Sequence, residues 1–462
     1  MLHSGARDRD DSAAVVTDED PASAAALPPP APGVASTRGT FANAVGKLSA
    51  VNVVTLLCAF ITGPITARAL GVDGRGQLAA IIAVLTLGPW LLDFGMGQWL
   101  ARERARGGDR ERLLGTALPV VIGVSLISLV VALPLSHAIG AGRPVVITVL
   151  QIGMFLMPIS VVLFALGGLA VGEARWGLYA AARLVGAILP VVVLVALAAA
   201  GSLTVALAAA SYLISGLLGS LLLLRTVQGV RRLTFSLRRS AAAAKFGAQC
   251  WLGQVAGTAT NRLDQVLMAA LVPSRELGLY AVAVTIASLA YGPIQAVSAA
   301  LFPRVAEGDP ALASRACRIT ALVVAIVAVV LGAIAPAMIP FMFGEDFRAA
   351  VPMVLILLVA SIASAISVVL SAALVAVNEP GATMRAELAA LAVSIPALIV
   401  FLPGFGGRAA ALISVMAYTV RVALQLAAAQ RAFSTPVRSF LLPTGADFRW
   451  LLAQTRRGGA RT

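Results

Sequence analysis

The chain has 462 residues, of which 59% are hydrophobic and only 12% are charged, and its mean hydropathy is +0.93. Soluble globular domains carry about 25% charged residues, so this composition excludes them and indicates a membrane protein with many spans. The formal net charge of +14 does not point to a nucleic-acid partner, because the arginines lie in short loops between apolar runs, where membrane topology places them.

Residues 1–42 show no hydrophobic periodicity and contain a proline-rich run, so we expect a disordered cytoplasmic tail. The tail lacks the pattern of a cleaved signal peptide, so the first apolar run should remain as a membrane helix. Each crossing of a hydrocarbon core needs about 20 apolar residues. Twelve such segments are predicted at 43–69, 77–101, 113–136, 145–171, 177–200, 203–224, 245–273, 278–302, 316–342, 350–377, 385–402 and 408–430.

Lysine and arginine are distributed unequally between the two sets of loops that join these segments. The set that would share a side with the N-terminus holds 16 of them, and the other set holds 6. Because basic residues favour cytoplasmic loops, both termini are expected inside. The expected location is a bacterial-type plasma membrane, where the basic loops would also contact anionic lipid head groups.

The two halves of the sequence repeat at an offset of 202 residues. At this offset Gly76 matches Gly278, where each glycine begins a predicted helix, and Arg102 matches Arg304. Six helices per repeat require parallel repeats, related by an axis along the membrane normal. The sequence therefore predicts an all-α polytopic membrane protein of about twelve transmembrane helices in two six-helix pseudo-symmetric lobes. The expected bounds are 43–224 and 245–430 for the lobes, 225–244 for a basic cytoplasmic linker and 431–462 for a basic cytoplasmic tail.

Two predicted helices carry polar side chains along one face. In the helix at 245–273 they recur at helical spacing, as Gln254, Thr258, Asn261, Arg262 and Gln265. The 202-residue offset places Asn52, on the first predicted helix, over Gln254. Lipid would leave these groups without hydrogen bonds, so the face is expected to line a polar cavity, with packing between helices as the alternative.

Basic residues within or beside the predicted helices are candidates to bind an anionic substrate. They are Arg262, Arg421, Arg183, Lys47 and Arg68. Arg262 and Asp264 are two residues apart, on nearly opposite faces of a continuous helix, so they are not expected to neutralise each other. Arg262 and Arg421 therefore either meet a partner from another helix or form a cationic site. For the other three, the alternative is a head group that reaches water.

Asp93 is the only acid well inside the first predicted lobe, and Asp264 is its nearest equivalent in the second. A membrane carboxylate can carry a coupling proton or sodium ion, and a structural pair with an arginine is the alternative. The chain has only two histidines, and its three cysteines have spacings that suit no zinc site. No paired carboxylates, nucleotide loop or nucleophile–base set occurs, so no metal, cofactor or enzymatic activity is expected.

Several short stretches carry a family resemblance. They are TARALGVDGRG at 66–76, NRLDQ at 261–265, LGLYAVA at 277–283, FPR at 302–304, and GEDF at 344–347 followed by Pro352. In order and spacing, over about 43–430, they resemble the polysaccharide (O-antigen type) flippase family. That family belongs to the multidrug/oligosaccharidyl-lipid/polysaccharide exporter superfamily.

The resemblance implies a two-lobed bundle that moves polyprenyl-diphosphate-linked oligosaccharides to the outer leaflet, for cell-envelope or exopolysaccharide assembly. In such proteins a cationic lumen receives the sugar and diphosphate, and Arg262 and Arg421 match that role here. Implied partners are the lipid-linked substrate and, in the same process, a polysaccharide polymerase or glycosyltransferases. The chain departs from the lipid II flippase, which has two extra helices, and from cation-coupled drug exporters, which carry an acid on helix one.

Two other functions stay open at this stage. A cation-coupled small-molecule exporter of the multidrug type would need a smaller, more aromatic and more acidic pocket, whereas only 6% of this chain is aromatic. A membrane scaffold would use its polar residues for helix packing alone. Loss of function in Arg262→Ala or Arg421→Ala variants that still fold would weigh against the scaffold.

Overall fold

The computed structural model describes residues 34–140, 142–230, 232–260, 262–290, 310–377 and 379–441. The chain divides into two compact units, Met1–Asn43 and Ala44–Thr462. In the first unit, the described residues 34–43 form the start of helix α1 (Val34–Leu92), so this helix begins ahead of the predicted position 43. Everything below concerns the second unit.

The described residues form helices joined by short connections, with no strand among them. In the first half of the chain α1 is followed by α2 (Met96–Ala105), α3 (Arg110–Gly140), α4 (Pro144–Phe155), α5 (Met157–Gly172), α6 (Trp176–Ala199), α7 (Val205–Leu221) and η1 (Leu222–Thr226). The second half contains α8 (Leu237–Thr260), α9 (Leu263–Leu271), α10 (Ser274–Ser288), α12 (Pro310–Phe343), η2 (Glu345–Ala350), α13 (Val351–Ala376), α14 (Pro380–Phe433) and α15 (Arg438–Leu441).

These helices agree with the predicted membrane spans. Each of the twelve predicted segments is mainly helical over its described residues, with breaks at 93–95, at 156 and at 262, and the segment at 278–302 is helical to Ser288 and lies outside the described residues after 290. By length and composition, six helices of the described chain can cross a membrane, and α4 with α5, bent by 51°, can form a seventh span. The all-α, multi-pass class is therefore confirmed. The number of crossings is not read directly from these helices, because α1 and α14 each contain two predicted spans.

Two glycines divide these long helices into arms. Gly71 in α1 has φ 68°, and Gly406 in α14 has φ 55°, both in the left-handed region that glycine adopts without steric cost. The chain can therefore reverse its direction at each glycine without a loop. In α1 the consequence is that residues just beyond Gly71 belong to a helix that packs against the rest of the protein.

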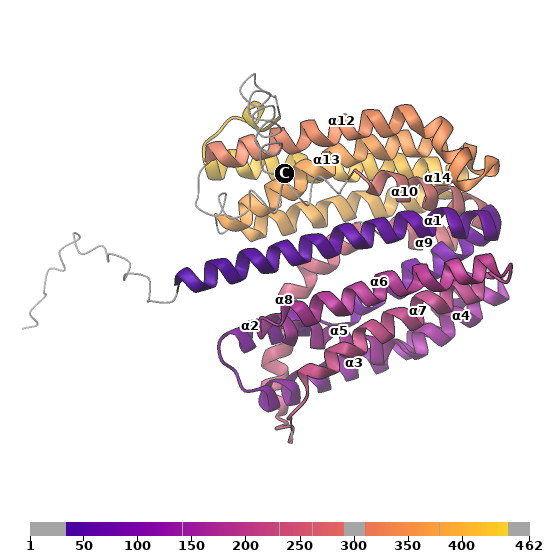
Figure 1. Ribbon diagram of the computed structural model, residues 1–462. Coiled ribbons are helices and arrows are strands. Elements are labelled where there is room, and N and C mark those ends of the chain that lie inside the picture. Colours follow the sequence, from indigo (N-terminus) through magenta and orange to yellow (C-terminus); the bar gives the residue numbers. More distant parts are fainter. Residues whose placement is uncertain are drawn as a thin grey trace, which may run out of the picture. The chain divides into compact units, whose positions relative to one another are not determined.

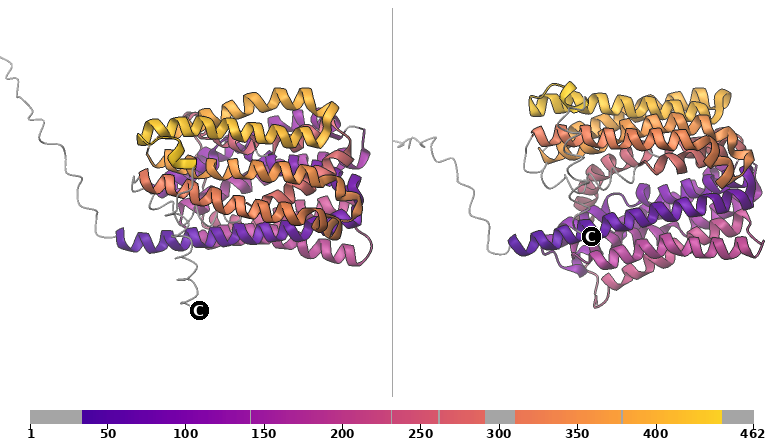
Figure 2. Two further views of the ribbon diagram at one scale, coloured as in Figure 1. Left: turned by 90° about the horizontal axis from the view of Figure 1, so that it is seen from above. Right: turned by 45° about the horizontal axis from the view of Figure 1, so that its top comes forward.

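The helices of each half pack mainly on one another. In the second half, α13 packs against both α12 and α14, and in the first half α6 packs against α7 and α2 against α5. Figure 1 shows α12, α13 and α14 together on one side of α1, and α3 to α7 on the other. The further views in Figure 2 keep the orange and yellow helices of the second half alongside one another.

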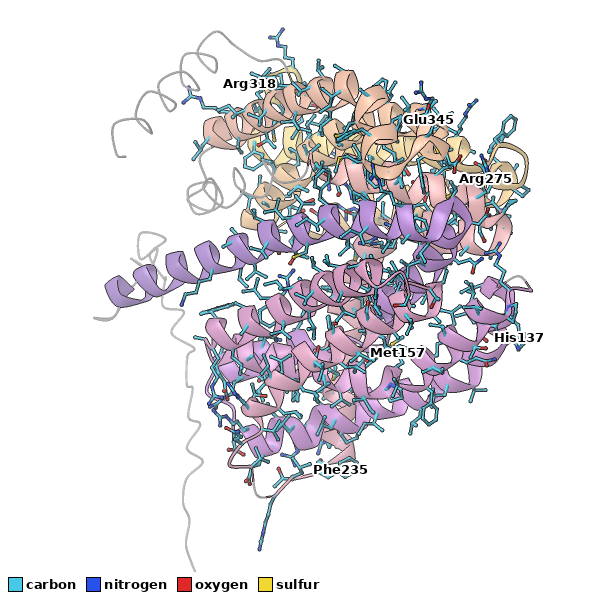
Figure 3. The ribbon with its side chains drawn as sticks, turned by 45° about the vertical axis from the view of Figure 1, so that its right-hand side comes forward. His137, Met157, Phe235, Arg275, Arg318 and Glu345 are labelled. Carbon is cyan, nitrogen blue, oxygen red and sulfur yellow. The ribbon has the colours of Figure 1, made fainter. Side chains whose placement is uncertain are left out.

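The bundle has two ends, which we name by their residues. The Gly76 end holds the turn at Gly71 and the turn at Gly406. The basic end holds the connections 106–109, 173–175 and the described residues 227–230 and 232–236, on the opposite side of the helices. Figure 3 shows His137, Arg275 and Glu345 towards the Gly76 end, whereas Phe235 and Arg318 lie towards the basic end.

At the Gly76 end, the repeated glycines of the two halves pack directly against each other. A β-carbon at Gly76 would lie 2.9 Å from the Gly278 nitrogen and against the Ser274 carbonyl oxygen. A β-carbon at Gly278 would lie 3.1 Å from the Gly76 nitrogen and against the Val72 carbonyl oxygen. Both pairs of contacts are related by the offset of 202 residues. At this point the two halves therefore meet through contacts that the predicted repeat relates to each other.

Helix α8 connects the two halves. It begins at Leu237, inside the segment predicted as a linker, and its first turns pack on the first half. Ser240 Oγ donates to the Thr116 carbonyl oxygen at 2.9 Å, and Trp251 Nε1 donates to the Leu91 carbonyl oxygen at 2.7 Å. Both α8 and α9 pack against α14 of the second half, and α9 also contacts α3 of the first half. The predicted helix at 245–273 is thus broken at Arg262, and both of its parts contact both halves.

Candidate functional site

A cavity of about 920 Å³ lies between the two halves. From the first half, helices α1, α6 and α7 contribute to the wall. From the second half, helices α8, α9, α10, α13 and α14 contribute to it. A volume near the upper end of the usual ~300–1,000 Å³ range for ligand pockets leaves room for a group larger than a small metabolite.

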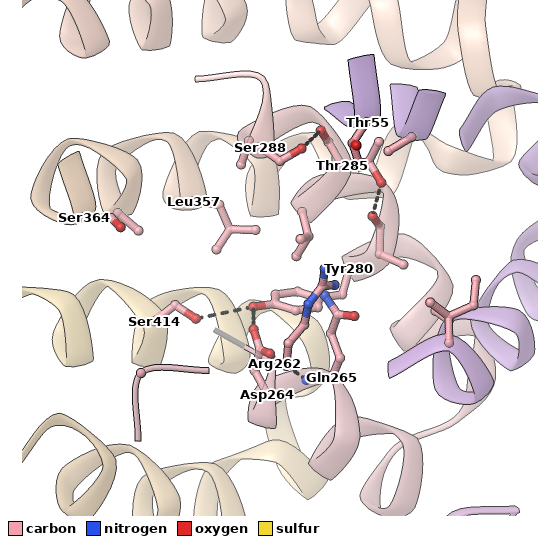
Figure 4. A pocket seen from close by; sticks show the side chains of 18 of the residues that line it. Thr55, Arg262, Asp264, Gln265, Tyr280, Thr285, Ser288, Leu357, Ser364 and Ser414 are labelled. Carbon is pink, nitrogen blue, oxygen red and sulfur yellow. Dashed lines mark hydrogen bonds between the residues drawn. The ribbon is translucent and has the colours of Figure 1, made fainter. Parts of the chain in front are cut away.

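Three arginines in the cavity wall form no salt bridge with a carboxylate among the described residues, and one of them, Arg262, lies close enough to Asp264 for electrostatic attraction. They are Arg75 on the second arm of α1, Arg183 on α6 and Arg262 at the start of α9. The Nε atom of Arg75 is buried and makes no hydrogen bond within the described part of the chain. The side chains of Arg183 and Arg262 are exposed, and Figure 4 shows Arg262 beside Tyr280 in the cavity. Unpaired guanidinium groups are strong donors for phosphate and carboxylate groups.

Asp264 is held by hydrogen bonds on the second-half side of the cavity. Its Oδ2 atom accepts a hydrogen bond from the Tyr280 hydroxyl, and its Oδ1 atom accepts one from the Gln265 nitrogen at 2.7 Å. The Tyr280 hydroxyl oxygen also lies 3.3 Å from Ser414 Oγ (Figure 4). The carboxylate therefore joins α9, α10 and α14 at the point where they meet.

Arg421 is paired rather than free. Its Nη1 atom donates to Glu387 Oε1 at 3.1 Å and to Oε2 at 3.3 Å, and its Nη2 atom donates to Ser364 Oγ at 3.2 Å. Its guanidinium also lies 4.8 Å from the ring centre of Tyr418. Only 4% of Arg421 and 9% of Glu387 are exposed, so the pair is nearly shielded from solvent while it borders the cavity. Arg421 was a candidate either to pair with another helix or to form a free cationic site. The structure shows the pairing, because Glu387 lies on the other arm of α14, before Gly406.

One geometric expectation is wrong. Arg262 and Asp264 were expected on opposite faces of a continuous helix, but both line the cavity. Arg262 has φ −137° and ψ −16°, outside the helical region, and α9 begins only at Leu263. The spacing rule for helices therefore does not apply across this position.

The other predicted lining residues are divided between the cavity and the rest of the structure. Gln265 is buried in the cavity wall. Asn52 and Thr258 are half-buried and Lys47 is exposed, and none of the three is in the wall that the described residues form. Asn261 and the side chain of Gln254 lie outside the described residues.

Arg68 and Asp93 satisfy backbone groups at helix ends. Arg68 Nε donates to the Met342 carbonyl oxygen at 2.9 Å, and its Nη2 atom donates to the Phe341 carbonyl oxygen, near the end of α12. Cations are favourable at this end of a helix. The Asp93 carboxylate accepts from the Gly97 nitrogen at 3.0 Å, in the first turn of α2, and lies outside the cavity wall of the described chain. Both residues therefore have a structural role in this arrangement.

Three residues of the cavity are not predicted as site residues from the sequence. Arg75 lies between the predicted helices 43–69 and 77–101, Glu387 lies at the start of the predicted helix 385–402, and Tyr280 belongs to the LGLYAVA stretch at 277–283. A signal for Glu387 was available, because a mid-membrane arginine such as Arg421 requires an acid on a neighbouring helix. With these residues included, the described wall holds four arginines and two carboxylates, so it carries a net positive charge.

The fold and the site define the class of the protein: a multi-pass helical membrane protein with a polar cavity between its two halves. The family model described as polysaccharide biosynthesis protein matches residues 41–308, more than half of the sequence. The chain belongs to this polysaccharide biosynthesis protein family. No curated protein shows a significant sequence match.

Solved structures of low sequence identity share the fold. The lipid II flippase MurJ, in its inward closed conformation, is 12% identical with a TM-score of 0.71, over 85% of this chain and 88% of that one. An inward-facing multidrug resistance transporter of the MATE family, in the MOP superfamily, is 14% identical with a TM-score of 0.63, over 82% and 94%. A MOP superfamily transporter from Pyrococcus furiosus, described as having a binding pocket of reverse polarity, is 16% identical with a TM-score of 0.56, over 85% and 96%.

Proposed function

We propose that the protein is a flippase that moves polyprenyl-diphosphate-linked oligosaccharide across the cytoplasmic membrane by alternating access, in cell-envelope or exopolysaccharide assembly. The observation that carries this proposal is the trio of unpaired arginines, Arg75, Arg183 and Arg262, in a large cavity between the halves. A diphosphate head group would be prohibitively costly to move through hydrocarbon, whereas a polar, positively charged cavity compensates its charge. The proposed role is transport without covalent chemistry.

The proposed orientation places the basic end of the bundle and both termini in the cytoplasm, because the loops at that side hold the excess of arginine. Head groups would enter the cavity from the cytoplasmic leaflet and leave towards the Gly76 end after the two halves rock about their common axis. Anionic lipids and the polymerase or glycosyltransferases of the same process are the proposed partners.

A second candidate is a cation-coupled small-molecule exporter, since the MATE transporter shares the fold and Asp264 supplies a carboxylate to the cavity. Under either function, Asp264 is our proposed site for a coupling cation, because its carboxylate lies where α9, α10 and α14 meet. Asp93 is less suited, because it caps a helix outside the cavity wall of the described chain.

Deletion of the gene is expected to cause lipid-linked oligosaccharide to accumulate in the cytoplasmic leaflet, and wild-type protein should relieve this accumulation. Arg75→Ala and Arg262→Ala are each expected to lower the rate of complementation about 10- to 100-fold, because each removes a charged hydrogen-bond donor worth about 1.5–3 kcal/mol. Arg348→Ala is the matched control, because Arg348 is exposed and pairs with Glu345 away from the cavity. Altered drug efflux without accumulation would favour the exporter instead.

Cys58 gives an independent test of cavity occupancy. Cys58 lines the cavity and is half-buried, whereas Cys317 is fully buried. In a Cys250→Ala background, a water-soluble maleimide is expected to label Cys58, and added lipid-linked oligosaccharide should slow the labelling at least fivefold. A labelling rate that does not change at saturating substrate would place the binding site elsewhere.

A further inference from the structure

The two walls of the cavity differ in charge. The described residues of α1, α6 and α7 contribute Arg75 and Arg183 and no acid, so this wall is cationic. The described residues of α13 and α14 contribute Arg421 and Glu387, which neutralise each other. A substrate with a charged part and a neutral part would therefore be oriented by the cavity, with its anionic part towards the first half.

The neutral wall is rich in hydroxyl groups at regular spacing. Ser364, Ser367 and Ser371 recur at three- and four-residue intervals on α13, so they share one face of the helix, and all three line the cavity. Two of them are fixed by other side chains: Ser364 by Arg421, and Ser371 by Gln425 Nε2, which donates at 2.9 Å. Two of the three hydroxyls in this wall are therefore held in place by neighbouring side chains.

The ion pair has an unused donor. Arg421 is 4% exposed and lines the cavity, yet its buried Nε atom makes no hydrogen bond among the described residues. Nearly all buried polar atoms are satisfied in native proteins, so this atom calls for a further partner. A guanidinium donates, a carboxylate accepts, and hydroxyls do both. Neighbouring hydroxyls of a sugar ring also donate and accept, and they match such a set.

We propose that Glu387, Arg421 and the serines Ser364, Ser367 and Ser371 form a subsite for uncharged sugar rings, distinct from the arginines that bind diphosphate. This inference rests on the proposed function and assigns its specificity: the first-half wall binds the diphosphate, and α13 with α14 binds the sugars. From the sequence, Arg421 is a candidate to bind the diphosphate. In this proposal it binds neutral sugar hydroxyls instead, because Glu387 neutralises its charge.

The test compares two probes with the purified full-length chain in lipid nanodiscs. One is undecaprenyl diphosphate, which has no sugar, and the other is the lipid-linked oligosaccharide isolated from the deletion cells. The combined variant Ser364→Ala, Ser367→Ala and Ser371→Ala should lose about tenfold or more in affinity for the glycolipid, because several hydrogen bonds are removed, and less than twofold for undecaprenyl diphosphate. Arg75→Ala should weaken both probes.

Ser361→Ala is the matched control, since Ser361 is equally buried on α13 but bonds the Leu358 carbonyl oxygen and is not in the described cavity wall. The serine variants keep the buried ion pair, so they are expected to fold even where Glu387→Gln does not. If the triple serine variant lost affinity equally for both probes, or for neither, the sugar subsite would be overturned. Failure of the wild-type protein to bind either probe would instead contradict the proposed function itself.

Discussion

Arg421→Ala is expected to lower the free energy of unfolding by about 3–5 kcal/mol, the cost of leaving one member of a buried ion pair without its partner. Glu387 would be left in a site that is 9% exposed, with no other cation paired to it in the described chain. The variant also removes the donor to Ser364. Thermal unfolding of the purified protein, followed by tryptophan fluorescence, measures the change.

A double variant separates the ion pair from the rest of the site. Arg421→Met combined with Glu387→Leu removes both charges, and such replacements of buried pairs are typically neutral or stabilising. We therefore expect the double variant to recover most of the stability that each single variant loses. Arg348→Ala, in an exposed pair, should change stability by less than about 1 kcal/mol. A loss in the double variant as large as the sum of the single-variant losses would show that the two side chains contribute independently, and it would contradict a coupled ion pair.

Gly278→Leu is expected to abolish the folded protein or to destabilise it by more than about 3 kcal/mol, because the added side chain would overlap backbone atoms of the other half. Its neighbours are the Val72 carbonyl oxygen and the Gly76 nitrogen, and backbone atoms cannot rotate away. Gly76→Leu should behave alike, since the same contact is made from the other side. The yield of monodisperse protein in size-exclusion chromatography measures the effect.

Gly216→Leu is the control for the glycine variants. Gly216 also lies within a helix, α7, but a β-carbon there would meet no atom within 4 Å. Normal yield for this variant together with loss for Gly278→Leu would assign the effect to the contact between halves. Normal yield for Gly278→Leu would mean that the halves do not pack through these glycines.

The helices and their internal repeat could be predicted from the sequence because the bilayer imposes a length and an apolar composition on every span. The pairing of Gly76 with Gly278 follows from the same repeat, although only the structure shows that the two glycines touch. Arg262 and Gln265 could be identified as cavity residues because a polar face in a membrane helix has few other places to lie.

Departures from the predicted helix ends explain most of what was missed. Arg75 was assigned to a loop, but the chain reverses at Gly71 alone, so Arg75 already lies on a helix and reaches the cavity. Glu387 was assigned to the edge of a span, but α14 begins at Pro380, so Glu387 is nearly two turns inside it. The break at Arg262 could not be predicted, because the polar residues around it, Asn261, Asp264 and Gln265, are equally compatible with the polar face of one continuous helix.

The most direct test of the account is leaflet translocation by the purified protein in proteoliposomes loaded with lipid-linked oligosaccharide. A membrane-impermeant glycosidase or lectin would report the glycolipid that reaches the outer leaflet. We expect wild-type protein to accelerate its appearance, Arg75→Ala and Arg262→Ala to be at least tenfold slower, and Arg348→Ala to match wild type. Wild-type vesicles that expose glycolipid no faster than protein-free vesicles, with the protein shown to be folded, would contradict the flippase function.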